Sequence, residues 1–221
     1  NVLRDMIESG RFATVKLTEI FRQAGQSLIV TNAHRINTGE SPVLDRGDND
    51  FFFLARNSDS AIAATVVDLY KNRLPKAYGA ETVNQIQVIS PSRRGLGGTD
   101  NLNLMLQNTL NPKANGVPEF VHRERTFRMG DRVMQIRNNY ELEWTKDDKN
   151  GMGIFNGDIG EIRSVDLKSR CMSISFDERV VRYEFSQLDD LEHAYAITVH
   201  KSQGSEYPIV IIPMYSAPPM L

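Results

Sequence analysis

The sequence predicts an α/β protein in which a small antiparallel β-barrel interrupts a domain built on a parallel sheet. Up to about residue 118, strand-like apolar runs alternate with helical stretches, which is typical of parallel sheets with crossover helices. From residue 119 to 190, short β-runs and turn residues follow one another without helical periodicity, as in small barrels. We therefore expect residues 1–118 and 191–221 to form one α/β domain, with 119–190 inserted between them.

The first quarter of the chain predicts two helices and one strand. Asn1–Gly10 has the composition of a short helix ended by Gly10. Ser27 is expected to cap a second helix that stops before Gly39. Four apolar residues would share one side of this helix: Leu28, Ile29, Ala33 and Ile36. After a polar loop, Phe51–Leu54 is an apolar run of the buried-strand type.

Two helices and a strand complete the first α/β segment. The serines of Ser58–Ser60 are expected to cap a helix that continues to Leu74. Gln85–Ile89 is the next predicted strand. A further helix is expected over Asp100–Leu110, because leucines recur on one face, and Asn111-Pro112 would halt it.

The barrel region is predicted from β-runs separated by glycine- and aspartate-containing turns. The expected strands are Thr126–Arg137, Ile154–Asn156, Ile159–Val165, Met172–Phe176 and Val180–Phe185. Tyr140 and Trp144 fall in the longest predicted loop, where packing of the loop is favoured over stacking on nucleic-acid bases. Cys171 lies in a β-run and is expected to be a small core residue.

The overall composition is that of an ordinary globular protein without a global basic signal. The chain has 40% hydrophobic and 24% charged residues and a net charge of −2, so any nucleic-acid surface must come from local clustering. Val121–Arg137 carries five arginines, which suit either a strand-tracking groove or outward-facing edge strands. A single cysteine, no long apolar run and no signal peptide favour a cytoplasmic protein. The chain does not begin with Met, and we expect it to be a piece of a longer protein.

Metal ligands are not predicted, because His34, His122 and His193 have no partners at metal-ligand spacing.

The strongest functional signal is the polar segment His200–Pro208, which lies between the apolar runs Ala194–Val199 and Ile209–Ile212. Loops between strands of α/β folds often carry function.

Several residues of this polar segment suit a phosphorylated ligand. His200 and Lys201 can contact an anion, Gly204 allows close approach to the backbone, and Glu206 can accept from a sugar hydroxyl. From the residues alone, an ordinary solvated connection between two strands remains open.

The run TVHKSQGSEYPIVII, residues 198–212, closely resembles motif V of superfamily 1 helicases in the form found in RecD-like enzymes, the family of the exodeoxyribonuclease V alpha subunit. The resemblance implies that Thr198 and His200, with Lys201 beside them, contact single-stranded DNA. It also implies that Gly204 and Glu206 face ATP. Gln203 is a further candidate for sensing the nucleotide, without an independent argument.

The resemblance extends over the whole order of the chain. RecD-like helicases place an SH3-like insertion, domain 2B, inside their second RecA-like domain, 2A, just before motif V. LTEIFRQ, residues 17–23, resembles motif IV, whose arginine reaches the γ-phosphate and corresponds here to Arg22, the catalytic candidate. ISPSRRGLGGTDNLN, residues 89–103, resembles a segment near the DNA backbone, which makes Arg93 and Arg94 candidates for DNA binding.

With the neighbouring glycines, Arg93 and Arg94 are expected to form a backbone-lined phosphate site at the start of the Asp100 helix. A solvated basic turn is an equally good interpretation.

The resemblance implies a DNA helicase of recombination and repair that moves 5′ to 3′ on single-stranded DNA, driven by ATP and Mg²⁺. No GxxxxGK[ST] motif and no Asp-Glu pair of the Walker B kind occur, and motif VI is not found. ATP and Mg²⁺ would therefore need a missing N-terminal RecA-like domain, and the chain alone is expected to be inactive.

Nuclease-complex subunits are further candidate partners, and no membrane partner is expected. The alternative is a non-catalytic nucleic-acid-binding module of the same architecture, while a nuclease lacks the clustered carboxylates it would need.

Overall fold

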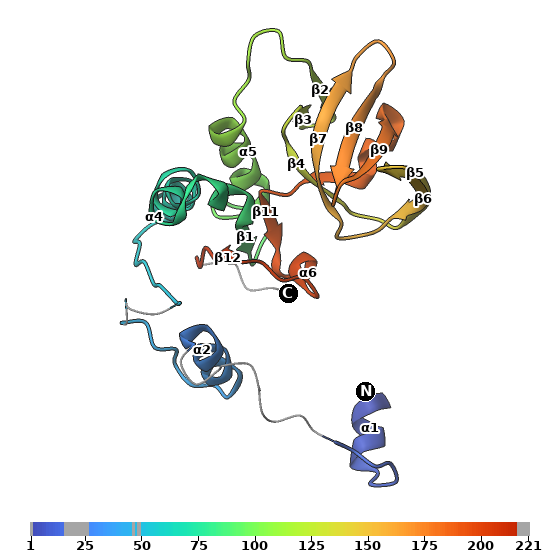
Figure 1. The fold of residues 1–221 in the computed structure, drawn as a ribbon. Coiled ribbons are helices and arrows are strands. Elements are labelled where there is room, and N and C mark those ends of the chain that lie inside the picture. Colours follow the sequence, from blue (N-terminus) through green and yellow to red (C-terminus); the bar gives the residue numbers. More distant parts are fainter. Residues whose placement is uncertain (1, 16–26, 46, 48–49, 216–221) are drawn as a thin grey trace. The chain divides into compact units, whose positions relative to one another are not determined.

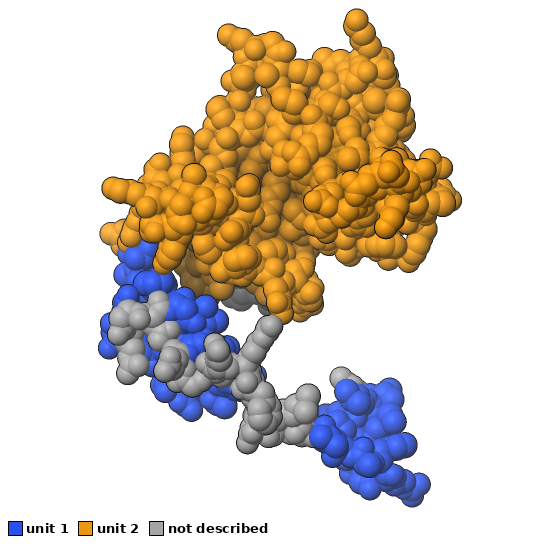
Figure 2. Space-filling model, viewed as in Figure 1, with its two compact units in different colours: residues 1–55 blue, residues 56–221 orange. Residues whose placement is uncertain are grey.

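The computed structural model describes residues 2–15, 27–45, 47 and 50–215 (Figure 1). They belong to two compact units, residues 1–55 and residues 56–221 (Figure 2). The motif IV candidate LTEIFRQ, with Arg22, lies outside the described residues. No helix in the described part of the chain is long and apolar enough to cross a bilayer.

The first unit contains two helices, α1 (Val2–Glu8) and α2 (Leu28–Asn37). As predicted, Ser27 caps α2: its hydroxyl accepts from the Val30 N–H at 3.2 Å. The Asp50 carboxylate adds a second cap, since it accepts from the Leu28 N–H at 2.8 Å. The expected apolar side is only partly right, because Leu28 is buried whereas Ile29 and Ile36 are exposed.

The strand predicted over Phe51–Leu54 is wrong. The segment has no regular structure, and the side chains of Phe52 and Phe53 are 57% and 51% exposed. A short apolar run has no periodicity that identifies it as a helix or a strand. It forms a strand only where a neighbouring strand pairs with it. No strand of the described chain pairs with it.

The second unit begins with a nearly continuous helical stretch. It consists of α3 (Asp59–Asp68), the π-helical turn η1 (Leu69–Arg73) and α4 (Leu74–Tyr78), so the predicted helix continues one turn beyond Leu74. Pro75 has no N–H to donate, and the wider π turn before it lets the helix pass this break in the hydrogen-bond ladder.

The α/β part of this unit is built around one buried strand, β1 (Ile86–Ser90). β1 pairs in parallel with β11 (Ala196–Thr198) on one side and β12 (Ile209–Ile211) on the other, in the order β11-β1-β12. The expected parallel sheet, joining segments more than 100 residues apart, is therefore present. A short 3₁₀ turn, η2 (Ala80–Gln85), leads into β1.

Helix α5 (Thr99–Leu110) packs on this sheet, as predicted, and its Leu102 and Leu106 are fully buried. They share a core with Tyr70 of η1 and Val88 of β1. The sheet and α5 thus provide a rigid support for the loops at the ends of β1 and β11.

Nine strands between α5 and β11 form the β-domain. They are β2 (Glu119–His122), β3 (Arg125–Arg128), β4 (Arg132–Gln135), β5 (Asn139–Lys146), β6 (Lys149–Ile154), β7 (Ile159–Asp166), β8 (Cys171–Phe176), β9 (Arg179–Glu184) and β10 (Leu191–His193). β2 and β3 form a hairpin, and the other seven form an antiparallel sheet in the order β10-β4-β7-β8-β9-β5-β6. The edge strands β10 and β6 each pair with one strand only in the described chain, so the hydrogen bonding does not close a barrel.

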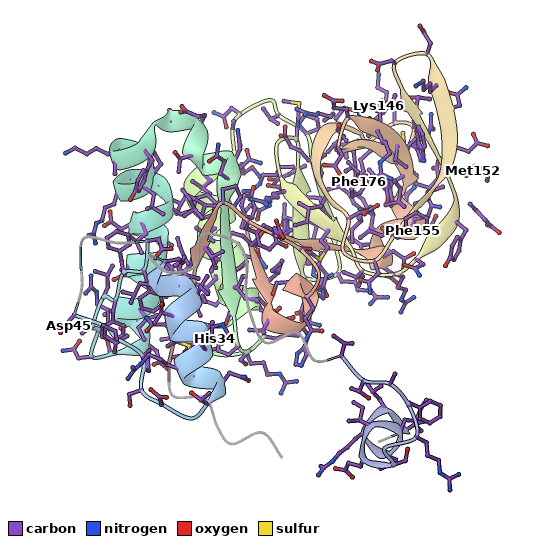
Figure 3. The ribbon with its side chains drawn as sticks, turned by 60° about the horizontal axis from the view of Figure 1, so that its bottom comes forward. His34, Asp45, Lys146, Met152, Phe155 and Phe176 are labelled. Carbon is purple, nitrogen blue, oxygen red and sulfur yellow. The ribbon has the colours of Figure 1, made fainter. Side chains whose placement is uncertain are left out.

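The β-domain has its own core, in which Phe127, Ile162, Ile174 and Phe176 are fully buried. Phe176 lies inside the domain, whereas Met152 lies on its outer side and is 61% exposed (Figure 3). Cys171 is buried, as predicted.

Three predictions in the β-domain are wrong. The predicted strand Ile154–Asn156 overlaps β6 at Ile154 only. The run Thr126–Arg137 breaks at Gly130, which has φ of +87° and separates β3 from β4. The predicted long loop with Tyr140 and Trp144 is instead the hairpin β5–β6. Trp144 packs flat over Gly151, where any Cβ would come within 2.2 Å of the indole. Leu142 and Trp144 alternate with Glu141 and Glu143 along β5, which is a strand signal that the loop prediction overlooked.

The β-domain and the α/β part are joined through β10 and β4. β10 pairs with β4, and the chain then enters β11 of the parallel sheet after only Ala194 and Tyr195. The Arg132 guanidinium of β4 donates to the Ile86 carbonyl of β1 at 2.9 Å. A 3₁₀ turn, η3 (Phe185–Asp190), precedes β10 and is closed by a capping box.

Candidate nucleic-acid interface

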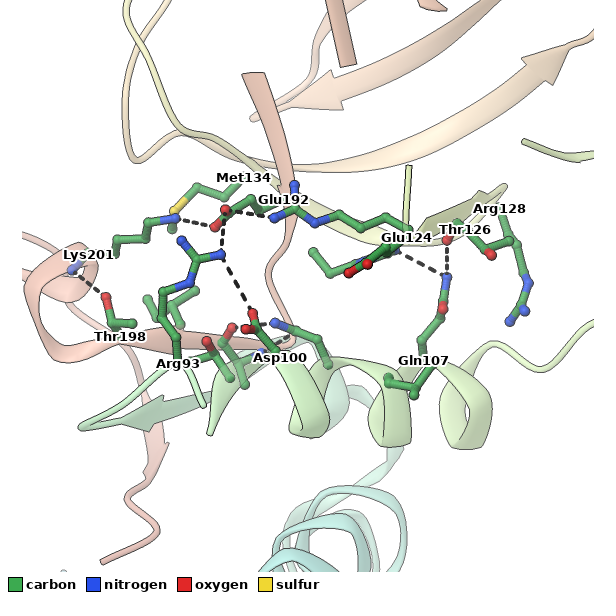
Figure 4. A pocket seen from close by; sticks show the side chains of 17 residues that line it. Arg93, Asp100, Gln107, Glu124, Thr126, Arg128, Met134, Glu192, Thr198 and Lys201 are labelled. Atoms are coloured by element: carbon green, nitrogen blue, oxygen red, sulfur yellow. Dashed lines mark hydrogen bonds and ion pairs between the residues drawn. The ribbon is translucent and has the colours of Figure 1, made fainter. Parts of the chain in front are cut away.

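A pocket of about 390 Å³ lies where the α/β part meets the β-domain (Figure 4). Helix α5 and the loop before it form one wall, and β3 with the residue before it forms another. The segment from β10 to the short helix α6 (Val199–Ser202) completes it. Three of the five predicted DNA-binding residues line this pocket: Arg93, Thr198 and Lys201. The other two, Arg94 and His200, do not.

The loop Ser92–Gly98 determines where Arg93 lies. It folds back over the first turn of α5, so that the Thr99 N–H donates to the Ser92 carbonyl and the Asp100 N–H donates to the Arg93 carbonyl, both at 3.0 Å. Gly98 permits this close approach, because a Cβ there would lie 2.3 Å from the Arg94 carbonyl oxygen.

Two amides of the expected backbone-lined phosphate site at the start of α5 are not free to bind a phosphate. The Thr99 and Asp100 amides, which would have faced a phosphate, are already bonded to the chain's own carbonyls. The side chains of this loop remain available, and they point in different directions. Arg93 extends into the pocket and forms ion pairs with Asp100 at 3.6 Å and Glu192 at 3.2 Å. Arg94 is exposed and has no ion pair with the described residues.

Helix α6 places Thr198 and Lys201 side by side. Thr198 is the last residue of β11 and the N-cap of α6, and its hydroxyl accepts from the Lys201 N–H at 3.4 Å. The Lys201 ammonium donates to Glu192 across the pocket (Figure 4). The segment was expected to be a loop, although threonine before a short polar stretch is itself a helix-start signal.

Glu192 of β10 is the centre of the charged groups, and sequence reasoning missed it. Besides Arg93 and Lys201, it accepts from the Arg125 guanidinium at 2.9 Å, and its side chain is only 16% exposed. Burial by itself raises the pKa of Glu192, but the bond from Lys201 and the nearby Arg125 and Arg93 outweigh this and hold the pKa below its usual value. The Glu192 carboxylate is therefore charged at neutral pH.

The arginine-rich stretch Val121–Arg137 does not form a groove of unpaired basic side chains, which was one of the two interpretations of its sequence. Acidic residues from distant segments pair with most of it: Arg123 with Asp189, Arg125 with Glu192, Arg128 with Glu119 and Arg137 with Asp190. Of this stretch, only Arg125 and Arg128 have cationic groups that line the pocket.

A buried carboxylate, Asp131, links several elements next to the pocket through hydrogen bonds. Its side chain is fully buried and accepts from Gln107 at 2.6 Å, Asn111 at 2.8 Å, the Arg128 N–H at 2.7 Å and the Tyr195 hydroxyl at 3.1 Å. Burial and the Asp131 carboxylate both raise the pKa of Tyr195, so its hydroxyl stays protonated and donates. This cluster joins α5, the β3–β4 turn and the segment before β11.

The predicted nucleotide-facing residues Gln203, Gly204 and Glu206 lie after α6, all of them exposed and none in the pocket. Gly204 has φ of +82° with open space around it, so its conformation rather than a close neighbour requires glycine. No group of three or more His, Cys, Asp or Glu side chains in the described residues is arranged to hold a metal ion. The described residues therefore do not by themselves fit a Mg²⁺ site.

Comparisons with known proteins identify the family. The model of the SH3 domain of ATP-dependent RecD-like DNA helicases matches residues 102–176, and that of the UvrD-like helicase C-terminal domain matches residues 193–221. The ATP-dependent RecD2 DNA helicase of Deinococcus radiodurans is 32% identical over 204 residues, which is 92% of this chain and 25% of that protein. The chain belongs to the RecD-like helicase family.

This RecD-like chain spans about a quarter of the length of that curated relative. An uncharacterized protein of Methanocaldococcus jannaschii, MJ1519, is 34% identical over 96 residues, covering 38% of the chain and 8% of that protein. Among solved structures, unliganded Pif1 from Bacteroides sp matches with 13% identity, 81% and 83% coverage of the two chains and a TM-score of 0.34.

The two helicase models together account for most of the RecD-like pocket. Gln107, Arg125 and Arg128 lie in the first matched segment, and Thr198 and Lys201 lie in the second. The pocket thus forms where the two family segments meet. Arg93, Asp100 and Glu192 of the pocket lie outside both matches, with Glu192 between the two segments.

Proposed function

We propose that this chain is the DNA-binding C-terminal part of an ATP-dependent DNA helicase and that its pocket binds phosphates of single-stranded DNA. One observation carries the proposal. Arg93, Thr198 and Lys201, which the sequence marks in two separate motifs, converge on one pocket together with Arg125. Guanidinium, ammonium and hydroxyl groups are the usual donors to phosphate oxygens.

The composition of the pocket suits binding without base readout. Its charged and hydroxyl groups fix a phosphate backbone in place but carry no information about sequence, as translocation along any strand requires. His200 and Arg94 lie next to pocket residues in the chain and are exposed, and we place them along the path of the strand on either side.

The nucleotide would bind on a different surface. In this proposal Gln203, Gly204 and Glu206 form one wall of the ATP site, and Arg22 approaches the γ-phosphate. The lysine and the Mg²⁺ ligands come from an N-terminal RecA-like domain. ATP hydrolysis then drives movement in the 5′-to-3′ direction, in recombination and repair in the cytoplasm. Nuclease-complex subunits are candidate partners.

We further propose that residues 1–118 and 191–221 form a RecA-like domain 2A, and that residues 119–190 are an SH3-like barrel insertion, 2B. The parallel pairing of β1 with both β11 and β12 supports the first part. β10, which follows the proposed insertion in the chain, pairs with β4 of that insertion.

Arg93→Ala combined with Lys201→Ala is expected to weaken binding of the chain to a fluorescein-labelled oligo(dT) of about 15 nucleotides by on the order of tenfold or more. Two phosphate contacts are lost, so the slope of log K against log salt should also become shallower by about one to two. Fluorescence anisotropy at several salt concentrations measures both quantities.

The matched control is Lys168→Ala with Arg182→Ala, which removes the same charge from exposed positions outside the pocket. The control variant should bind within about twofold of the wild type. Equal losses in the two double variants would show that only net charge matters, and the pocket assignment would then be wrong.

A further inference from the structure

The cations of the pocket are already occupied by a carboxylate of the chain itself. Glu192 lies between Arg93, Arg125 and Lys201, which come from three different segments: the β1–α5 loop, β3 and α6 (Figure 4). Arg128 is committed elsewhere, since it donates to Glu119 at 2.9 Å and to the Asn111 carbonyl at 3.0 Å. The three cations best placed to meet a phosphate therefore all face the same carboxylate.

The pocket consequently has little net charge. Its lining contains four cationic side chains, Arg93, Arg125, Arg128 and Lys201, against three carboxylates, Asp100, Glu124 and Glu192. Glu192 is the most buried member of its ion pairs, at 16% exposed, so solvent screens its charge less than it screens the charge of the exposed Asp100. Any phosphate that enters must share the cations with it or displace it.

The cations do not depend on Glu192 alone for their positions. Arg125 also donates to the Leu191 carbonyl at 3.0 Å, and Arg93 is 3.6 Å from Asp100. The backbone of Lys201 is bonded to the Thr198 cap. Neutralising Glu192 should thus leave a preformed basic site and should not let the cations disperse.

We propose that Glu192 is a built-in competitor for the DNA phosphates and that it lowers the affinity of the pocket for single-stranded DNA. The inference rests on the proposed function and assigns Glu192 the role of setting affinity at the same site. A helicase must release each phosphate to advance along the strand. The Glu192 carboxylate favours that release, because it forms ion pairs with the same cations when the phosphate leaves. In this proposal the cations bind the phosphates, and Glu192 sets how tightly they do so.

The test compares Glu192→Gln with wild type in oligo(dT) binding. Glutamine keeps the shape of the side chain and removes its charge, so affinity should rise on the order of tenfold, and the salt dependence should steepen by about one phosphate equivalent. Glu192→Ala should shift affinity in the same direction. The control is Glu143→Gln, the same charge change at an exposed position on β5, and it should stay within about twofold of wild type.

The outcomes separate this inference from the proposed function. If Glu192→Gln and Glu192→Ala bind as weakly as wild type or more weakly, while Arg93→Ala with Lys201→Ala still loses binding, then Glu192 organises the cations and the inference is overturned. If the arginine–lysine double variant binds like wild type, the DNA site itself is misplaced. Circular dichroism melts of all variants confirm that the compared proteins are folded.

Discussion

Asp131→Ala is expected to lower the free energy of unfolding by about 3–5 kcal/mol, because it leaves several buried donors without an acceptor and each such donor costs about 1–3 kcal/mol. The substitution leaves donors of Gln107, Asn111, Tyr195 and the Arg128 backbone without their acceptor in a region closed to water. Urea denaturation followed by circular dichroism measures the change.

The matched control is Asp148→Ala, at an exposed turn position with no hydrogen bond or ion pair to the described residues. It should change stability by less than about 0.5 kcal/mol. A loss at Asp131 no larger than that of the control would show that the cluster does not hold the β-domain on the α/β part. Asp131→Asn should fall between the two, because its amide keeps one acceptor but turns a donor toward Gln107 and the Arg128 N–H.

The 221-residue chain by itself is expected to hydrolyse no ATP above background, with or without DNA. Phosphoryl transfer needs a cradle of backbone amides, a lysine and a held Mg²⁺, and the sequence contains no GxxxxGK[ST] motif. In the proposed ATP site, the exposed turn with Gln203, Gly204 and Glu206 is one wall only, so a bound triphosphate would stay hydrated. Phosphate release measured at saturating oligo(dT) checks this.

A second variant makes that result decisive. If turnover appears, Gln203→Ala with Glu206→Ala in the same chain shows whether it belongs to this protein or to a contaminant. Turnover that the double variant abolishes would belong to this chain and would contradict the expectation that it is inactive without an N-terminal RecA-like domain. Turnover that it leaves unchanged would indicate a contaminating ATPase.

The centre of the α/β part was predictable from sequence because central strands of parallel sheets are buried on both faces. Such strands read as continuous apolar runs. The run Gln85–Ile89 covers β1 except for Ser90, and Ala194–Val199 and Ile209–Ile212 contain β11 and β12. Helix α5 was predictable for a different reason, since its leucines recur on one face and Asn111-Pro112 ends it.

The hairpin β5–β6 and the segment Phe51–Leu54 were misjudged for opposite reasons. β5 was predicted to be a loop because of its charged residues, although Leu142 and Trp144 alternate with Glu141 and Glu143 as in a half-buried strand. It pairs with β6 and β9 and buries Leu142. Phe51–Leu54 reads as a strand but finds no partner among the described strands. In both cases pairing with another strand, which the local sequence does not contain, decides the structure.

Some residues of the candidate site could be predicted from sequence and others could not. Arg93, Thr198 and Lys201 lie in local motifs and could be named from sequence. Glu192, Arg125 and Asp131 act through partners far away in the chain, such as Gln107 for Asp131 and Arg93 for Glu192, and no local pattern marks them. Acidic residues that neutralise a basic stretch are likewise invisible until the chain is folded.

Photo-crosslinking tests the central claim most directly. An oligo(dT) strand carrying one 4-thiothymidine is crosslinked to the chain, and the attached peptides are identified by mass spectrometry. If the pocket binds single-stranded DNA, the crosslinks fall in the segments that line it, residues 93–107, 124–134 and 192–201. Crosslinks confined to the β5–β6 hairpin, where Tyr140 and Met152 are exposed, would contradict the assignment and place the DNA on another face of the β-domain.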